Sequence, residues 1–356
     1  MGKQEIVYVD DRFPVDKTNR SVFWKIETFE GQTEFWPILL EKAYAKLHGS
    51  YESLSAGRPE QGLVDITNGI SEVISFSSKE FGEMKNNGTF WEKLLESVEN
   101  KYLIAASSNG SSDSIQTDLG IVQGHAYAVL DVEEIEGIRL IQLRNPWGDS
   151  EWKGEWSDYD DVNWTENRKR KIDDLQRAKG HDPIRVGVID GAFWMTVSDF
   201  LANYVSLSIV RIYEYPNWHR TTIHGRWKGE NAGGWPNNHH TYWKNPQFKL
   251  IVRESTSAII YMQQFDKRGS RERETFAIGF AVYKNKGNKL QTNRPPRAQY
   301  KWPAYNFKRD FFTEYDKIEH YNYPYTVIWA TFNPGEETEF SLSIISEKEV
   351  QLEKFN

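Results

Sequence analysis

The sequence predicts an α+β domain followed by an all-β antiparallel sandwich. Two stretches near the start carry apolar residues at helical spacing, and the pattern changes to strands from about residue 102. After residue 216 the chain runs as short aromatic and β-branched segments separated by turn residues. With 356 residues, it is too long for one typical domain and short for three.

The first part of the chain contains a predicted strand, a predicted helix and a predicted linker. Residues 6–9 read Ile-Val-Tyr-Val and favour a strand. Residues 34–48 predict a helix that ends at Gly49, and residues 62–69 resemble a linker before a second helix that begins at Thr89. The first helix is expected to face the core through Trp36, Leu39, Leu40, Ala43, Tyr44 and Leu47.

Residues 124–145 predict a β-hairpin. Two alternating segments flank a turn at residues 133–137. If the turn is centred on Ile135 without a bulge, Asp131 faces Arg139, Val129 faces Ile141, Tyr127 faces Leu143 and His125 faces Asn145. The opposite-charge pair and the apolar pairs support this register.

The predicted register places His125 and Asn145 side by side, with Cβ atoms about 5 Å apart. An imidazole that takes a thiol proton and an amide that orients the imidazole are two members of a Cys-His-Asn triad. A lone strand histidine is more often structural. Here Pro146 biases Asn145 towards an extended conformation and Trp147 offers a cover from water, so we interpret the pair as functional in origin.

The composition limits the possible functions. The chain contains no cysteine, which excludes a disulfide framework, a thiolate metal site and a thiol nucleophile within it. No apolar stretch is long enough to span a bilayer and the start lacks a signal-peptide core, so a cytoplasmic location is expected. Neither glycine-rich phosphate loops nor base-stacking aromatics point to nucleotides or nucleic acid.

The second part of the chain predicts the sandwich. Strand-like segments at 248–252, 258–262 and 276–283 are separated by turn clusters, which lie at 286–288, 293–296 and 333–335. Residues 1–214 hold 23 basic and 36 acidic residues, whereas residues 215–356 hold 21 and 15. The basic half suits an anionic membrane surface, although solvated loop tips explain its cations about as well. The cations considered for such a patch are Lys267, Arg268, Arg271, Arg273, Lys284, Lys286 and Lys289.

Several motifs together resemble the calpain family. They are Val9–Pro14, Glu34-Phe35-Trp36, Glu41–Lys46, Gly49–Glu52, Gly124–Tyr127, Arg144–Trp152 and Asp190–Met195, followed by Gly225-Arg226-Trp227, Ala232-Gly233-Gly234 and Asn245–Phe248. The resemblance implies a papain-like protease core that is truncated at its N-terminus and followed by the calpain β-sandwich. The implied division is a remnant of the first lobe at 1–69, a second lobe at 70–213 and a sandwich at 214–356. In the family the catalytic cysteine precedes the segment like Glu34-Phe35-Trp36, so we expect it upstream of Met1.

The resemblance also implies roles for individual residues. His125 is the general base, Asn145 its orienting residue, and Trp147 fills the cleft until calcium aligns the two lobes. Calcium ligands of the second lobe map to Glu151, Asp158 and Asp190, with a backbone oxygen from Val188, and Glu34 maps to a first-lobe ligand. Ala192 stands where the family usually has another carboxylate, which weakens the expected affinity. Without the resemblance, these acids are ordinary surface charges.

Two functions follow from these expectations. In the first, the chain is part of a calcium-dependent cysteine endopeptidase that cuts extended protein segments once an upstream cysteine-bearing lobe completes it. In the second, it is a non-catalytic calpain homologue that acts as a calcium- or lipid-responsive binding protein. Both predict no thiol-dependent proteolysis by this chain alone.

Overall fold

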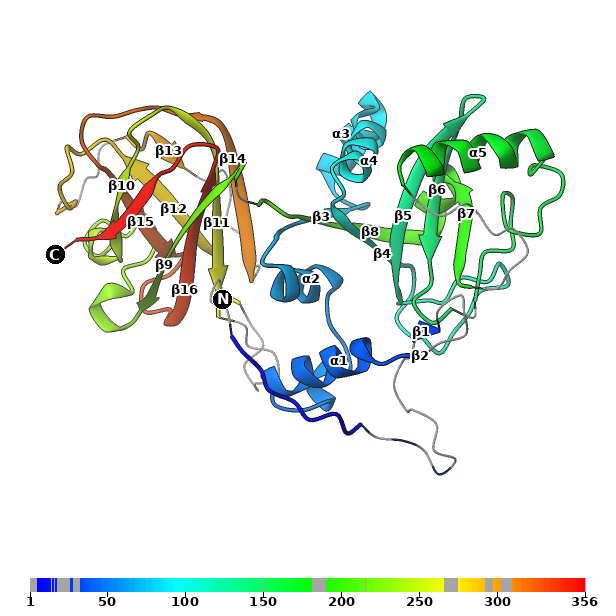
Figure 1. The fold of residues 1–356 in the computed structure, drawn as a ribbon. Coiled ribbons are helices and arrows are strands. Elements are labelled where there is room, and N and C mark those ends of the chain that lie inside the picture. Colours follow the sequence, from blue (N-terminus) through cyan, green and yellow to red (C-terminus); the bar gives the residue numbers. More distant parts are fainter. Residues whose placement is uncertain are drawn as a thin grey trace. The chain divides into compact units, whose positions relative to one another are not determined.

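The computed structural model describes residues 5–13, 15, 17, 26–27, 33–148, 150–180, 190–214, 216–265, 275–291, 297–301 and 309–355. Backbone contacts divide the chain into two compact units. One is Arg58–Arg211, and the other is Met1–Gly57 with Ile212–Asn356. Figure 1 shows the elements of each unit. None of the described helices is long and apolar enough to cross a bilayer.

The segment before residue 58 contains the predicted helix, but with a different buried face. Its elements are β1 (Ile26–Glu27), β2 (Thr33–Glu34), α1 (Trp36–Leu47) and the 3-10 helix η1 (Glu52–Leu54). In α1 the buried residues are Ile38 and Ala45. Three residues expected in the core are exposed instead: Trp36, Leu40 and Leu47. Helical spacing identifies residues that share a face, but it does not decide which face finds a partner.

The strand predicted at residues 6–9 is wrong. The described residues 5–10 take no regular structure, and Ile6 and Tyr8 are exposed. The carbonyl of Tyr8 accepts a hydrogen bond from Lys46 Nζ (2.7 Å), and the Lys42 ammonium pairs with the Asp10 carboxylate. Lysine side chains of α1 thus bind polar groups of this segment, including the Tyr8 carbonyl, which in a strand would accept a hydrogen bond from a neighbouring strand.

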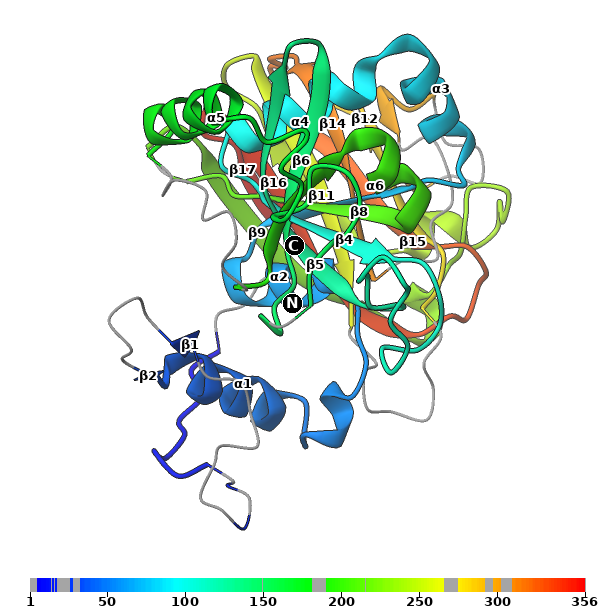
Figure 2. The same ribbon diagram turned by 90° about the vertical axis from the view of Figure 1, so that its right-hand side faces the viewer.

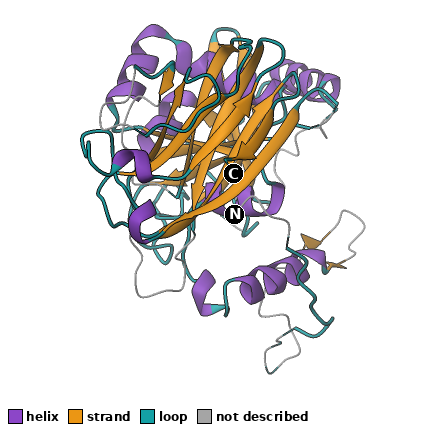
Figure 3. Ribbon diagram, turned by 90° about the vertical axis from the view of Figure 1, so that its left-hand side faces the viewer, coloured by secondary structure: helices purple, strands orange, loops and turns teal. Residues whose placement is uncertain are grey.

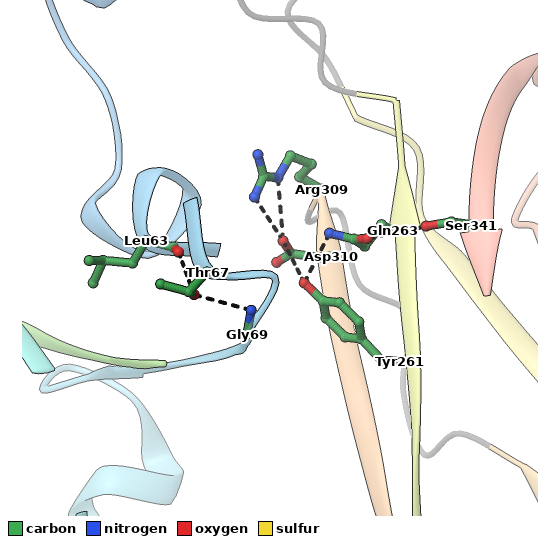
Figure 4. Close-up of polar contacts among 8 residues, drawn as sticks. All are labelled: Leu63, Thr67, Gly69, Tyr261, Gln263, Arg309, Asp310 and Ser341. Atoms are coloured by element: carbon green, nitrogen blue, oxygen red, sulfur yellow. Dashed lines mark hydrogen bonds and ion pairs between the residues drawn. The ribbon is translucent and has the colours of Figure 1, made fainter. Parts of the chain in front are cut away.

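The linker predicted at residues 62–69 is also wrong, because most of it is helix α2 (Pro59–Thr67). Pro59 suits the first helical turn, and Asn68 ends the helix in the left-handed conformation (φ 56°). Thr67 Oγ1 donates to the carbonyl of Leu63 (2.7 Å) and accepts from the Gly69 amide (3.2 Å), which secures this end (Figure 4). Gly62 costs such a helix only about 1 kcal/mol, so tertiary packing outweighs it.

An antiparallel six-stranded sheet forms the centre of the unit Arg58–Arg211 (Figure 2). Its order is β3-β8-β4-β5-β6-β7. The strands are β3 (Ile70–Ser75), β4 (Leu103–Ser108), β5 (Ala126–Ile135), β6 (Ile138–Arg144), β7 (Ala192–Thr196) and β8 (Tyr204–Arg211). The helices are α3 (Lys79–Asn87), α4 (Thr89–Glu99), which was predicted to begin at Thr89, α5 (Glu166–Ala178) and α6 (Val197–Asn203).

Both faces of this sheet are covered. Ile141 and Met195 belong to one core, together with residues of α3, α4 and α6. Their neighbours Leu140 and Trp194 belong to a second core with Ile172 of α5. Successive side chains of a strand point to opposite faces, so the two cores lie on opposite sides of the sheet.

The chain after residue 216 forms two antiparallel sheets, as predicted (Figure 3). Their orders are β13-β12-β15-β10-β17 and β14-β11-β16-β9. The elements are β9 (His219–Trp227), η2 (Gly229–Asn231), η3 (Tyr242–Lys244), β10 (Gln247–Ile251), β11 (Thr256–Gln264), β12 (Ile278–Tyr283), β13 (Tyr300–Lys301), β14 (Asp310–Ile318), β15 (Tyr325–Thr331), β16 (Thr338–Ser346) and β17 (Gln351–Lys354). Phe248 and Phe280 of one sheet share a buried core with Ile260 and Leu342 of the other, as in a β-sandwich. The turn predicted at 293–296 lies outside the described residues.

A row of buried polar groups connects strands β14, β11 and β16 (Figure 4). Ser341 Oγ donates to Gln263 Oε1 (3.1 Å), and Gln263 Nε2 donates to the Tyr261 hydroxyl (3.1 Å). That hydroxyl donates to Asp310 Oδ2 (3.1 Å), which also pairs with Arg309 (3.1 Å). Burial and the Asp310 charge raise the pKa of Tyr261 well above its usual value, so the hydroxyl keeps the proton that it donates.

Candidate active site

The hairpin of β5 and β6 differs in register from the prediction. A two-residue turn, Glu136-Gly137, joins the strands, and both residues have positive φ (54° and 81°). Ile135 therefore pairs with Ile138, and Asp131 pairs with Gln142 rather than with Arg139. The predicted five-residue turn was wrong because a two-residue turn of this type matches the twist of the strands.

A β-bulge at Leu130 changes the register again towards the open end of the hairpin. Val129 pairs with Leu143, whereas Val132 pairs with Ile141. Val129 and Val132 are three residues apart, yet both belong to the core that includes α3 and α4. The extra residue therefore reverses the alternation of faces along β5.

The bulge places His125 and Asn145 on one face of the sheet. Each residue lies one position beyond its strand, His125 before Ala126 and Asn145 after Arg144. In the register beyond the bulge they are diagonal neighbours on one face, a separation that long side chains bridge. His125 Nε2 lies 2.9 Å from Asn145 Oδ1. The two side chains thus meet as expected, although by a different register.

The Asn145 amide has a defined orientation. It is fully buried, its Oδ1 accepts from the backbone N–H of Trp147 (3.1 Å), and its Nδ2 donates to the carbonyl of Ser150 (3.2 Å). Since Oδ1 is only an acceptor, the neutral His125 ring must carry its proton on Nε2. Nδ1 then holds the lone pair, which is the arrangement that a proton acceptor requires.

Aromatic rings surround the imidazole. The Trp147 ring centroid lies 4.3 Å from that of His125, tilted by 42°, and the Tyr127 ring meets it edge-on at 5.2 Å. Trp147 is partly buried against the core on this face. The two rings restrict the motion of the imidazole, while the predicted calcium-dependent movement of Trp147 stays a prediction.

A buried serine holds the backbone of His125. Ser108 Oγ accepts from the His125 N–H (2.9 Å), and the backbone N–H of Ser108 donates to the His125 carbonyl (2.9 Å). Ser108 Oγ also donates to the carbonyl of Val122 (2.7 Å). Nothing in the sequence singled out Ser108, because a serine in a strand has no distinctive pattern.

The structure brings together two of the predicted calcium ligands, Glu151 and Asp190. Glu151 Oε1 accepts from the backbone N–H groups of Asp190 (2.9 Å) and Gly191 (2.8 Å). Burial raises the pKa of Glu151, the two backbone bonds oppose this shift, and the Asp190 charge adds to it. Glu151 Oε2 is buried without a hydrogen-bond partner in the described part of the chain. A buried carboxylate oxygen beside a second acid fits a hard cation.

The remaining predicted ligands are less closely defined. Asp158 is buried, Val188 lies outside the described residues, and Glu34 accepts from Trp36 Nε1 (2.8 Å). Among the described residues, no three His, Asp or Glu side chains are grouped so as to hold a metal ion. Carbonyl oxygens would have to supply further ligands, so the calcium site stays a prediction.

The predicted basic patch is only partly described. Four of its residues lie outside the described part of the chain: Lys267, Arg268, Arg271 and Arg273. Of the others, Lys284 lies 3.3 Å from the Glu319 carboxylate and over the Tyr321 ring. Lys289 lines a cavity of about 610 Å³ that also contacts Arg226, Lys244 and Lys354.

An imidazole whose Nε2 is fixed by a side-chain amide is the base and orienting pair of papain-like cysteine hydrolases. Comparison with protein families defines the class more closely. The family described as "Calpain family cysteine protease" matches residues 1–211, and "Calpain large subunit, domain III" matches residues 223–345. The chain belongs to the calpain family.

Individual relatives match nearly the whole chain. It is 34% identical to the calpain-type cysteine protease DEK1 of Zea mays over 369 residues, which cover 99% of this chain and 16% of the relative. It is 33% identical to the calpain-1 catalytic subunit of Rattus norvegicus and 32% identical to that of Homo sapiens, over 98% of this chain and 50% and 51% of those relatives. The family is one of hydrolases, but this chain has no cysteine and cannot supply the thiolate itself.

Proposed function

We propose that this chain provides the base half of a calcium-dependent, calpain-type cysteine endopeptidase whose thiol comes from a segment outside it. The observation that carries the proposal is the 2.9 Å contact between His125 Nε2 and Asn145 Oδ1. It leaves Nδ1 as the acceptor for the proton of a nucleophile. After attack, the imidazolium returns this proton to the leaving amine, and Asn145 keeps the ring aligned.

Reconstitution tests this proposal. The chain is co-expressed with the cysteine-bearing segment of the rat calpain-1 catalytic subunit, and cleavage of casein is followed with and without a thiol alkylating agent. Alkylation-sensitive cleavage is expected from the complex and from neither part alone. An isolated, stable complex of both segments that cleaves nothing would contradict the proposal.

Calcium dependence is the second part of the proposal, and a short path connects the acidic pair with Asn145. The carbonyl of Gly191 accepts from the Asn145 N–H (2.7 Å), and the N–H of Gly191 donates to Glu151 Oε1 (2.8 Å). Gly191 has φ +85°, and a Cβ there would lie 2.6 Å from the Asn145 carbonyl oxygen. When bound, calcium would supply positive charge that compensates the buried Glu151 carboxylate, and Glu151 and Asp190 would hold it.

Thermal unfolding in calcium and in magnesium tests this site. Calcium at about 100 times its dissociation constant should stabilise the chain by about 2.7 kcal/mol, with a smaller effect from magnesium. Glu151→Gln should remove the calcium effect, whereas the matched change Glu155→Gln, at an exposed acid, should keep it. Equal calcium effects in the two variants would overturn the assignment of Glu151.

A second function, binding of an anionic membrane surface by the sandwich, is favoured by the cavity near Lys289. Arg226, Lys244, Lys289 and Lys354 line it, and within the described residues none of them forms an ion pair. The cavity contains one acid, Glu230, among its lining residues. Unpaired cations around a hollow attract phosphorylated head groups by charge.

Vesicle sedimentation tests this second function. Binding to phosphatidylserine vesicles should exceed binding to neutral vesicles and weaken with salt. The double variant Lys244→Gln/Lys354→Gln should bind about 30-fold less tightly, at about 1 kcal/mol per lysine. The control Lys317→Gln/Lys348→Gln changes two exposed lysines outside the cavity lining and should bind normally. Equal losses in both double variants would rule out the cavity as the binding site.

A further inference from the structure

We propose that Asp131 and Lys179 are positioning residues for the site, because they hold the bulge of β5 that aligns His125 with Asn145. The alignment of His125 with Asn145 is a geometric property of this chain and does not depend on catalysis. Its importance for catalysis rests on the proposed function. Asp131 lies in β5 and Lys179 is the C-cap residue of α5, 48 residues further along the chain.

These two residues satisfy the backbone next to the bulge. Asp131 Oδ1 accepts from the Val132 N–H (2.8 Å) and from Lys179 Nζ (2.6 Å). Lys179 Nζ also donates to the Val132 carbonyl (3.3 Å) and pairs with Glu133 Oε1 (2.6 Å). Both backbone groups of Val132 therefore have side-chain partners at the point where the register shifts.

The register shows why the bulge matters for the site. Between the turn and the bulge, the numbers of paired residues add to 273, as in Val132 with Ile141. If this register continued, odd-numbered residues of β5 would share a face with even-numbered residues of β6. His125 and Asn145, both odd-numbered, would then point to opposite faces. Beyond the bulge the numbers add to 272, and the two residues share a face.

Burial makes the arrangement specific. The Asp131 side chain is fully buried, and the Lys179 side chain is 30% exposed. A carboxylate without its cation is strongly destabilised in such a site, so the pair favours the one backbone arrangement in which they meet. The pKa of Lys179 is raised, because its bonds to Asp131 and Glu133 outweigh the opposing effect of burial.

NMR of the histidine-labelled chain tests the proposal without any catalysis. The signal of the His125 Nε2 proton, assigned with His125→Gln, reports the hydrogen bond to Asn145 by its slow exchange with water. Lys179→Met should accelerate this exchange at least about tenfold and remove the cross-peaks between the ring and the Asn145 amide. Deletion of Leu130, the extra residue, removes the bulge but leaves the pairs Val129 with Leu143 and Asp131 with Gln142 in place, so it should keep the His125 signal.

The matched control is Arg211→Met. Arg211 is buried and pairs with Glu72 (2.6 Å) in the same sheet, so its loss should also destabilise the unit. It should leave the His125 signal within about twofold of that of the unchanged chain. If Lys179→Met unfolds the chain, Lys179→Gln keeps a donor for Asp131 and should show a smaller acceleration.

Two results would overturn the proposal. One is a His125 signal in Lys179→Met or Lys179→Gln that matches the signal in Arg211→Met. The other is loss of the signal after deletion of Leu130 in a chain that still folds. If the His125 signal depends on Lys179 but the reconstituted protease is inactive, the positioning role is supported. Only the proposed function is then contradicted.

Discussion

Replacing His125 with alanine is expected to lower kcat of the reconstituted protease at least about 10,000-fold and to change KM little. The imidazole accepts and returns a proton only along the reaction path, so its loss affects the transition state more than substrate binding. Asn145→Ala should cost less, about 100-fold, because the amide orients the ring and does not transfer a proton. Single-turnover and steady-state peptide hydrolysis measure both effects.

The control for this prediction replaces a different histidine. His239 is exposed in the sandwich region, and His239→Ala should retain full activity. If His125→Ala keeps more than a tenth of kcat in a complex that contains the cysteine, His125 is not the base. Equal losses in kcat and affinity for a substrate analogue would point to a folding defect instead.

The residues of the candidate pair could be predicted from the sequence, but their exact pairing could not. Alternating segments on either side of residues 133–137 identified the hairpin and the meeting of His125 with Asn145. In our proposal the bulge at Leu130 depends on Lys179. This residue lies at the end of helix α5, 48 residues after its partner Asp131. Local patterns carry no information about such a distant contact.

Contacts between residues far apart in the sequence also explain other differences between the predicted and the observed elements. Residues 62–69 contain two glycines, which favour a linker, but burial of Val64 and Glu60 stabilises a helix there. The Glu60 carboxylate accepts from Ser208 Oγ (3.0 Å), a contact that spans 148 residues. In contrast, β10, β11 and β12 lie close to their predicted positions, because alternation and turn residues are local signals.

Replacing Trp329 with alanine is expected to have the largest effect on the stability of the sandwich. Trp329 is fully buried, and its ring stacks on Phe280 (5.9 Å) and Phe340 (5.7 Å). Its loss should lower the free energy of unfolding by about 3 to 5 kcal/mol, through lost burial and the cavity left behind. Urea unfolding of the full chain measures this change.

A pair of milder substitutions separates packing from hydrogen bonding. Trp227 Nε1 donates to the carbonyl of Trp329 (3.1 Å), whereas the buried Trp329 Nε1 has no hydrogen-bond partner among the described residues. Both indoles are buried, so Trp→Phe removes a similar volume at each position. Trp227→Phe removes one hydrogen bond from the buried Trp329 carbonyl. Trp329→Phe removes the unsatisfied Nε1 donor, whose burial costs about 1 to 3 kcal/mol. Trp329→Phe should therefore be the less destabilising change. If Trp329→Phe instead lowers the free energy of unfolding more than Trp227→Phe does, packing alone decides the stability of this core.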